Sequence, residues 1–309
     1  MQSRRRGVQA AVLSAFFLGM APIFGKQAIL RGLPPLAVVA LRTLLATLLL
    51  LALIAAFRCP FLRIYPLGLV GCLLAGAING TGSLFYYGAL GRIDAGIGQL
   101  LYSFYPVFVA LWLWLDRQPP TKLTLFRIAL AVPAVGLLTL GGAHRLDPWG
   151  MAMMLAAAAL YALHLPVNQR VLFDVPAPTV TLYTLAAMSA VVVPAFLLVG
   201  PVTLPHTEAT WAPVLGLTMV TFLSRLTLFL GVKHIGGMQT ALLGLGELLV
   251  TLAFSHWWLH ESLTLTQWGG AALLAVILLL AGVDKPTMPT KRDPVGGWLS
   301  WLRPRGFSP

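Results

Sequence analysis

Charge is scarce in this chain, and acidic side chains are the scarcest. Only 10% of its 309 residues are charged, with 9 acidic against 21 basic residues. Soluble domains carry about a quarter charged residues, so water cannot be the solvent for most of this surface. The chain is 58% hydrophobic, and its mean hydropathy is +0.85. These shortages exclude an ordinary soluble protein and predict an all-α membrane protein.

Cysteines and catalytic motifs are also few or missing. The two cysteines, Cys59 and Cys72, are too few for a disulfide framework and lack metal-site spacing, so we interpret them as free thiols. The sequence has no Walker loop, no Gly-x-Ser-x-Gly elbow and no aspartate inside an expected span. We therefore expect neither an enzyme nor an ATP-driven pump, and no cofactor.

The net charge of +12 would suggest a nucleic-acid partner in a soluble protein. Here the basic residues lie mostly in short connections between apolar runs, where they act as topology signals. With the N-terminus inside, 15 Lys and Arg fall on the cytoplasmic side and three, Arg31, Arg92 and Arg145, fall outside. This asymmetry predicts a protein of the cell (inner) membrane with both termini in the cytoplasm. It also gives the basic residues a role that needs no nucleic-acid partner.

Apolar runs of roughly 20 residues, the length that crosses about 30 Å of hydrocarbon, divide the chain into ten expected transmembrane helices. They lie near residues 8–30, 35–57, 65–90, 95–115, 123–142, 149–170, 178–199, 211–232, 237–258 and 265–283. The first run follows Arg4-Arg5-Arg6 and resembles a secretory signal. It continues past Pro22 without a cleavage pattern, so we interpret it as a span.

The basic tail, residues 284–309, contains Pro, Gly, Trp298 and Trp301. Its composition suits a disordered cytoplasmic end or an interfacial segment that touches anionic lipid.

The chain contains a duplication. Residues 84–121 align with residues 226–263 at an offset of 142, so that segment, turn and segment follow in the same order. Residues 7–35 align with 150–178 at an offset of 143. We predict two five-helix repeats, at 8–142 and 149–283. Five is an odd number, so the second repeat must cross the membrane in the opposite sense to the first.

Inverted repeats are typical of secondary transporters, whose substrate site lies near the membrane midplane between the halves. Exchanging the conformations of two similar halves would give an inward-open and an outward-open state. Pro22 and Pro166, at matching places in the first helix of each half, are candidate gating hinges.

Three stretches resemble the drug/metabolite transporter superfamily with paired EamA domains. They are PLAVVALRTLLATLLLLAL with Arg42, YYGALGRIDAGIGQLLYSFYPVFVAL, and HESLTLTQWGGAALLAVILLLAG. The family commonly has a Glu-Pro pair in the fourth span of each half. Here the first half has Tyr105-Pro106 and the second Glu247-Leu248, so each keeps one member. The resemblance covers roughly residues 8–283 and implies an exporter of amino acids, other metabolites or drugs, without naming the cargo.

Four charged residues fall within expected spans: Glu247, Arg42, Arg225 and Lys26. A charge at the bilayer centre costs about 2.5 to 3.5 kcal/mol. Glu247 could form a packing ion pair with Arg225 or Arg42. Alternatively it binds a proton or a cationic group, while an arginine binds a carboxylate. The excess of basic side chains favours a substrate that carries negative charge.

Several uncharged polar residues are further candidates for substrate binding. Gln99, Tyr102 and Tyr105 recur every three residues, so they either line a polar cavity or lie at the membrane interface. Gly244 and Gly246 allow close approach of a ligand or simply of another helix. Candidates of second rank, which could equally join helices by hydrogen bonds, are Asn79, Thr81, His164, Asn168 and Gln239.

His256, His260 and Glu261 suggest a metal site at first sight. Their order is His-Trp-Trp-Leu-His-Glu, whereas a zinc protease needs His-Glu-x-x-His, so we expect an interfacial cluster and no metal.

The sequence thus predicts a secondary transporter of small metabolites or amino-acid-like solutes, a monomer or homodimer, with protons as the candidate coupling ion. The alternatives are an efflux carrier for drugs or lipid-like molecules and a non-transporting membrane scaffold.

Overall fold

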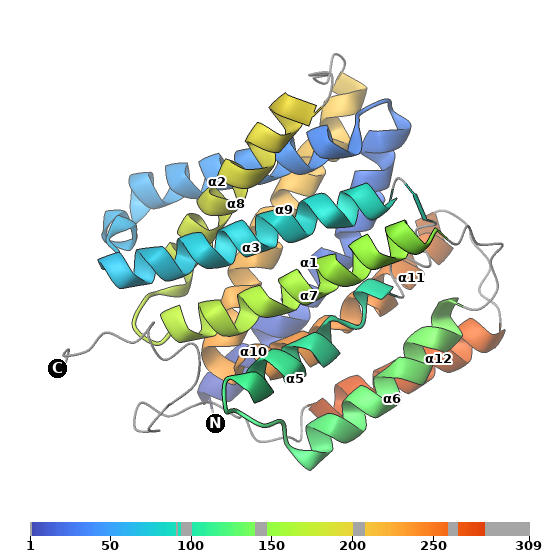
Figure 1. Ribbon diagram of the computed structural model, residues 1–309. Helices are drawn as coiled ribbons and strands as arrows, with labels where there is room; N and C mark the ends of the chain where they lie inside the picture. The colour runs from blue at the N-terminus through green and yellow to red at the C-terminus, as the bar shows by residue number, and fades with distance from the viewer. Residues whose placement is uncertain are drawn as a thin grey trace.

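The computed structural model describes residues 2–90, 92–93, 101–139, 147–199, 208–258 and 265–281, and every regular element in these ranges is a helix (Figure 1). The helices of the first half are α1 (Gln2–Leu30), α2 (Pro35–Phe57), the 3-10 helix η1 (Cys59–Leu62), α3 (Pro66–Leu90), α5 (Tyr105–Leu115) and α6 (Lys122–Thr139). Those of the second half are α7 (Pro148–Val171), α8 (Ala177–Val199), α9 (Glu208–Ile235), α10 (Gly237–Gly244), α11 (Gly246–Trp258) and α12 (Leu265–Ala281).

Within the described ranges, six helices are long and apolar enough to cross a membrane, namely α1, α2, α3, α7, α8 and α9. Shorter apolar helices cover Tyr105–Leu115 and Trp268–Ile277. The count of ten spans stays a prediction. The first helix begins at Gln2, earlier than the predicted start at residue 8.

Turn residues set the helix ends, as local sequence rules require. Gly32 has φ 92°, and Pro35 then opens α2. Pro is favoured at this position because the first N–H of a helix has no partner in any case. The Asp147 side chain caps α7 by accepting a hydrogen bond from the Trp149 N–H at 3.1 Å.

The fourth span of each half, expected at 95–115 and 237–258, contains a break within the described residues. A turn at Ser103 and Phe104 precedes α5, and a turn at Leu245 separates α10 from α11. Pro106 and the glycines on each side of Leu245 weaken helix continuity at these places. Ser103 and Leu245 are 142 positions apart, the offset of the duplication.

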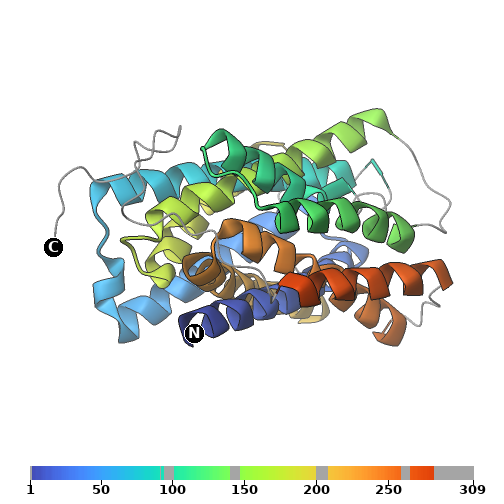
Figure 2. The same cartoon turned by 90° about the horizontal axis from the view of Figure 1, so that it is seen from below.

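The helices pack in two layers (Figure 2). One layer contains α3, α5, α6 and α7, coloured cyan to yellow-green, and the other contains α1 with α10, α11 and α12. The contacts between halves are reciprocal, because α1 packs on α9 while α3 packs on α7. Elements at equivalent positions also meet, as α2 with α8 and α6 with α12, and the two fourth spans meet where α5 packs on α10. Two similar halves related by a two-fold axis would produce this pattern.

A hydrogen bond between equivalent residues marks the place where the halves meet. Thr47 Oγ1 of α2 lies 3.0 Å from Ser189 Oγ of α8, and the two residues are 142 positions apart. Both side chains are buried. Residues on a two-fold axis contact their own counterparts, so this bond supports the duplication independently of the sequence alignment.

Candidate functional site

Buried polar side chains gather beside the break between α10 and α11. Glu247 is in the first turn of α11 and is 8% exposed. Its Oε1 atom has no hydrogen-bond partner within the described part of the chain. The N-terminal end of a helix carries partial positive charge, which favours a carboxylate there. The broken span thus presents a buried carboxylate that has no direct ion pair with any described side chain.

Arg225 of α9 is the basic residue that faces this carboxylate. It is 7% exposed and lies close enough for its charge to interact with that of Glu247. No ion pair joins the two residues among those that the structure describes. The packing ion pair that the sequence left open as an alternative is therefore not formed in this conformation.

A neutral residue holds Arg225 instead. In the amide orientation that the guanidinium requires, Asn79 Oδ1 accepts hydrogen bonds from Arg225 Nη1 and Nη2, each at 3.2 Å. The guanidinium also lies over the Tyr161 ring, 5.6 Å from its centroid. The positive charge is therefore fixed in place without being cancelled.

Arg42 of α2 adds a second positive charge. Its guanidinium lies over the Tyr87 ring at 5.2 Å, and its charge interacts with that of Arg225. Its Nε atom is buried and lacks a hydrogen-bond partner among the described residues. The cluster of two arginines and one glutamate therefore carries an excess of positive charge.

Tyrosines form the wall beside these charges. The rings of Tyr102, Tyr105 and Tyr161 contact one another with centroids 5.1 to 5.9 Å apart, and Tyr86 packs on Tyr102 at 4.9 Å. The Tyr105 hydroxyl donates a hydrogen bond to the Ala241 carbonyl at 2.9 Å. Tyr105 is only 2% exposed, so it belongs to the interior and not to a membrane-interface belt.

The contact between the Tyr105 hydroxyl and α10 requires a glycine at position 244. A Cβ atom at position 244 would collide with the Tyr105 hydroxyl. The sequence left open whether Gly244 makes room for a ligand or for another helix. In the structure it makes room for α5, which approaches α10 closely at this point.

His164 of α7 is fully buried behind Tyr161. Its Nδ1 atom is hydrogen-bonded to the Tyr161 carbonyl, and its ring packs on Tyr161 with centroids 4.7 Å apart. Its Nε2 atom has no partner within the described ranges. Gln239 is buried on α10.

Other candidate residues are not brought to this cluster by the described structure. Gln99, His260 and Glu261 lie outside the described residues, as do Trp298 and Trp301. The helix positions of Lys26 and His256 are described but their side chains are not. The two candidate hinges differ: Pro22 is exposed on α1, whereas Pro166 is buried on α7.

One buried ion pair was missed by sequence reasoning. Arg170 Nη2 in the last turn of α7 lies 2.5 Å from Asp116 Oδ2 at the end of α5, and both side chains are at most 1% exposed. Gln118 donates a further hydrogen bond to the same oxygen at 2.7 Å. Arg170 and Arg127, two of the 15 basic residues counted above on the cytoplasmic side, are both buried. An aspartate directly after an apolar run, in a chain of 9 acidic residues, was the available signal.

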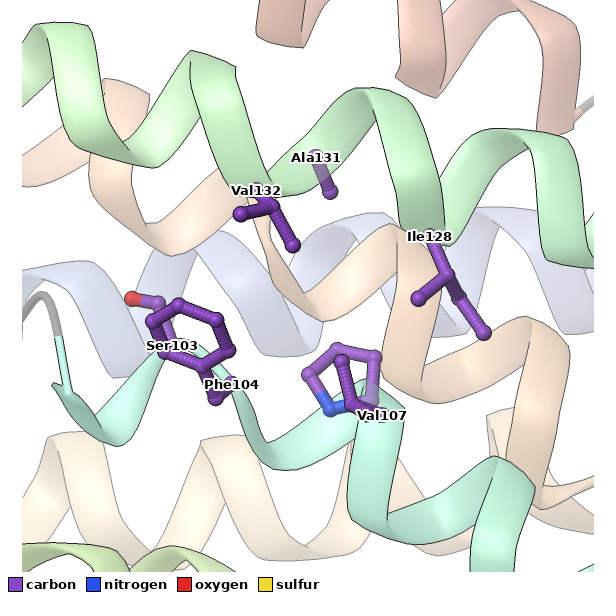
Figure 3. Close-up of a pocket in the computed structure, with 7 residues that line it drawn as sticks. Ser103, Phe104, Val107, Ile128, Ala131 and Val132 are labelled. Atoms are coloured by element: carbon purple, nitrogen blue, oxygen red, sulfur yellow. The ribbon is translucent and has the colours of Figure 1, made fainter.

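A separate apolar groove lies between α5 and α6 (Figure 3). Among its lining residues are Phe104, Val107, Ile128 and Val132, and Val107 and Val132 are exposed. Glu247 and the arginines are not part of it.

Long apolar helices, two broken spans and a buried charged cluster define a multi-pass membrane protein with the architecture of a carrier. The model of the EamA-like transporter family matches the chain twice, over residues 5–140 and 148–283. The chain belongs to this family, which confirms the resemblance inferred from its motifs.

Other comparisons add the fold alone. A comparison with curated protein sequences found no match. One solved structure, described as "Crystal structure of protein", superposes with a TM-score of 0.73 at 17% identity, over 90% of this chain and 96% of its own. At that identity the likeness shows a shared fold and nothing about cargo.

Proposed function

We propose that this protein is a secondary active transporter that exports a small metabolite or an amino-acid-like solute by alternating access. Family membership supports the class. The reciprocal packing of the two halves supports inverted repeats, and broken helices beside a buried polar cluster are the usual construction of a carrier's substrate site. The solute binds among Glu247, Arg225, Arg42 and the tyrosines.

Glu247 is the proposed coupling residue. The observation that carries this role is its buried carboxylate oxygen, which has no hydrogen-bond partner within the described ranges, together with a nearby but unbonded Arg225. A carboxylate in such a place binds and releases a proton according to whether the solute and the arginine are close to it.

The test is transport in proteoliposomes with a panel of amino acids, organic acids and amines, with and without an imposed pH gradient. Glu247→Gln keeps the shape of the side chain but cannot titrate. It should abolish accumulation driven by the gradient while solute exchange across the membrane continues.

Asp116→Asn is the matched control, because it makes the same chemical change at a buried carboxylate outside the site. Its folded fraction should keep the pH response of the wild type. A wild-type response to the gradient in Glu247→Gln would exclude the coupling role.

A lipid-like or drug-like cargo is the second candidate, and the groove between α5 and α6 favours it. Such a cargo needs an apolar opening toward the bilayer, and in this proposal the groove lined by Val107 and Val132 is that opening. Val132→Trp would fill the groove. The second candidate would be established over the first by two results together. The wild type would transport a lipid-like or drug-like cargo but no solute of the polar panel, and Val132→Trp would no longer transport that cargo.

We also propose that both termini face the cytoplasm, on the basis of the basic residues counted above. A single cysteine introduced at Ser300, in a variant without Cys59 and Cys72, should resist an impermeant thiol reagent in intact cells. It should react once the membrane is permeabilised. Rapid labelling in intact cells would reverse the orientation.

A further inference from the structure

Arg225 is held in an unusual way for a buried cation in a membrane protein. Its hydrogen bonds within the described chain go to Asn79, whose side chain is neutral, and its face rests on the Tyr161 ring. Asn79 is 2% exposed and Arg225 is 7% exposed. An amide oxygen orients a guanidinium but does not neutralise it, so a full positive charge remains in the interior.

The same chain shows the alternative arrangement. Arg170 is also buried, and it is paired with the carboxylate of Asp116 at 2.5 Å. A carboxylate at position 79 would provide Arg225 with a similar partner and would compensate its charge. Its absence leaves Arg225 with donors available, because an oxygen shared between Nη1 and Nη2 occupies only part of the guanidinium's five N–H groups.

Glu247 does not supply the missing partner in this conformation. Its charge interacts with that of Arg225, yet no ion pair is formed and Oε1 remains without a partner within the described ranges. With Arg42 in electrostatic range as well, the three charged groups sum to one excess positive charge. An incoming group with negative charge would complete the site.

We propose that the transported solute bears a carboxylate, that this carboxylate binds Arg225, and that Asn79 is a positioning residue that fixes the guanidinium without neutralising it. The planar fork of Arg225 matches a carboxylate in two parallel hydrogen bonds. The tyrosines next to it accommodate the less polar body of the solute. This inference rests on the proposed function and specifies its substrate class.

The test uses probes that share one skeleton and differ in charge: 4-methylpentanoate, leucine and leucinamide, with benzoate and inorganic phosphate as further anions. Binding is measured as the ligand-induced rise in unfolding temperature of the purified full-length protein. At least one carboxylate-bearing probe should stabilise the wild type, whereas leucinamide should not. Stabilisation by leucinamide or by phosphate alone, or by no carboxylate, overturns the proposal.

Asn79→Asp then separates positioning from simple packing. The new carboxylate should pair with Arg225, so the unliganded protein should unfold at the wild-type temperature or above it. The same carboxylate competes with the ligand, so affinity for the carboxylate-bearing probe should fall by about tenfold or more. If Asn79 only packed the helices together, Asn79→Asp would not lower the affinity for the probe while leaving the stability of the protein unchanged. Wild-type affinity in this variant overturns the proposal.

Asn168→Asp is the matched control. Asn168 is a buried amide on α7 whose hydrogen bonds go to the His164 carbonyl and to Thr184. The same substitution there should leave the affinity of the folded fraction unchanged. If Asn79→Asp does not fold, Asn79→Ser adds no charge and shortens the side chain, so that its oxygen no longer reaches the guanidinium, and it should weaken probe binding. Wild-type affinity in Asn79→Ser would then overturn the proposal.

The two proposals fail in different ways. A wild-type protein that moves no solute defeats the carrier function. A wild-type protein that moves a solute, with Asn79→Asp unchanged in affinity, defeats only the role of Arg225 and Asn79.

Discussion

Two buried arginines of this protein lie in opposite electrostatic circumstances. Arg170 joins the ends of α5 and α7 through a short ion pair with Asp116, reinforced by Gln118. Arg225 lies beside the break of the ninth predicted span, held by an amide and a ring, with an unbonded glutamate nearby. The charge of Arg170 is paired with a carboxylate, although its buried Nη1 atom has no hydrogen-bond partner among the described residues. The charge of Arg225 has no directly bonded carboxylate in the described part of the chain.

The difference separates structure from function. Removing one member of a buried pair leaves the other charge uncompensated, so Asp116 and Arg170 depend on each other in the folded protein. A group that must bind and release a solute or a proton cannot be satisfied permanently by the protein. The absence of a direct ion pair between Arg225 and Glu247 is the observation behind the site proposed above.

The largest expected effect is on stability, at the Asp116–Arg170 pair. Asp116→Leu or Arg170→Met alone should lower the free energy of unfolding by about 3 to 5 kcal/mol, because each leaves a buried charge without its partner. The double variant should recover most of the loss, since two apolar side chains need no partner. Denaturant titration of the purified protein in detergent measures both.

Glu247→Gln is the comparison variant, and its stability should stay within about 1 kcal/mol of the wild type because no direct bond is lost. If it is destabilised as strongly as Asp116→Leu, the contrast between the two clusters is lost.

A moderate effect is expected on turnover at Pro166. This residue lies on α7 between the site residues Tyr161 and His164 and the paired Arg170. If the two regions move relative to each other during alternation, the missing backbone hydrogen bond at a proline makes that bending easier. Pro166→Ala should slow transport by about fivefold, equivalent to about 1 kcal/mol of barrier, with little change in solute affinity.

Pro22→Ala, the counterpart in the first half, should act in the same direction. Initial-rate and binding measurements on both variants distinguish slowed alternation from weakened binding. Unchanged turnover in both would leave these prolines as packing features.

The smallest effect is expected at the neutral contact between the halves. Thr47→Ala or Ser189→Ala should each cost about 0.6 kcal/mol, the average for a hydrogen bond between membrane helices. Thr47→Ala also loses the hydrogen bond from Thr47 Oγ1 to the Thr43 carbonyl at 2.7 Å. The double variant should therefore cost little more than Thr47→Ala alone, because the bond between the two hydroxyls is lost in all three variants. Full additivity in a double-mutant cycle would show that the two hydroxyls do not interact.

Much of the fold was predictable because its signals are local or periodic. Apolar length predicts α1, α2 and α3, and the offset of 142 predicts which helices of the two halves are equivalent. The break at Leu245 had a signal in its flanking glycines, and the break at Phe104 had one in Pro106, but these weaken a helix without saying that it will break.

The candidate site was predictable only in its residue types. Depth within a span identified Glu247 and Arg225, because charge in hydrocarbon is costly wherever it occurs. The identity of their partners was beyond the sequence. Asn79 and Arg225 are 146 positions apart and come from different halves, and either could have been joined to other residues by hydrogen bonds. The Asp116–Arg170 pair likewise forms only after α5 and α7 come together.

Tyr105 and Glu247 are 142 positions apart, so they occupy equivalent positions in the two repeats. A symmetric pair of identical halves would hold either two tyrosines or two glutamates there. The repeats of this chain differ at that position: Tyr105 donates a hydrogen bond that joins α5 to α10, and the second repeat alone has a carboxylate there. A transport cycle that uses Glu247 therefore has a built-in stoichiometry of one such proton per molecule, whereas a dimer of unfused halves would carry an even number.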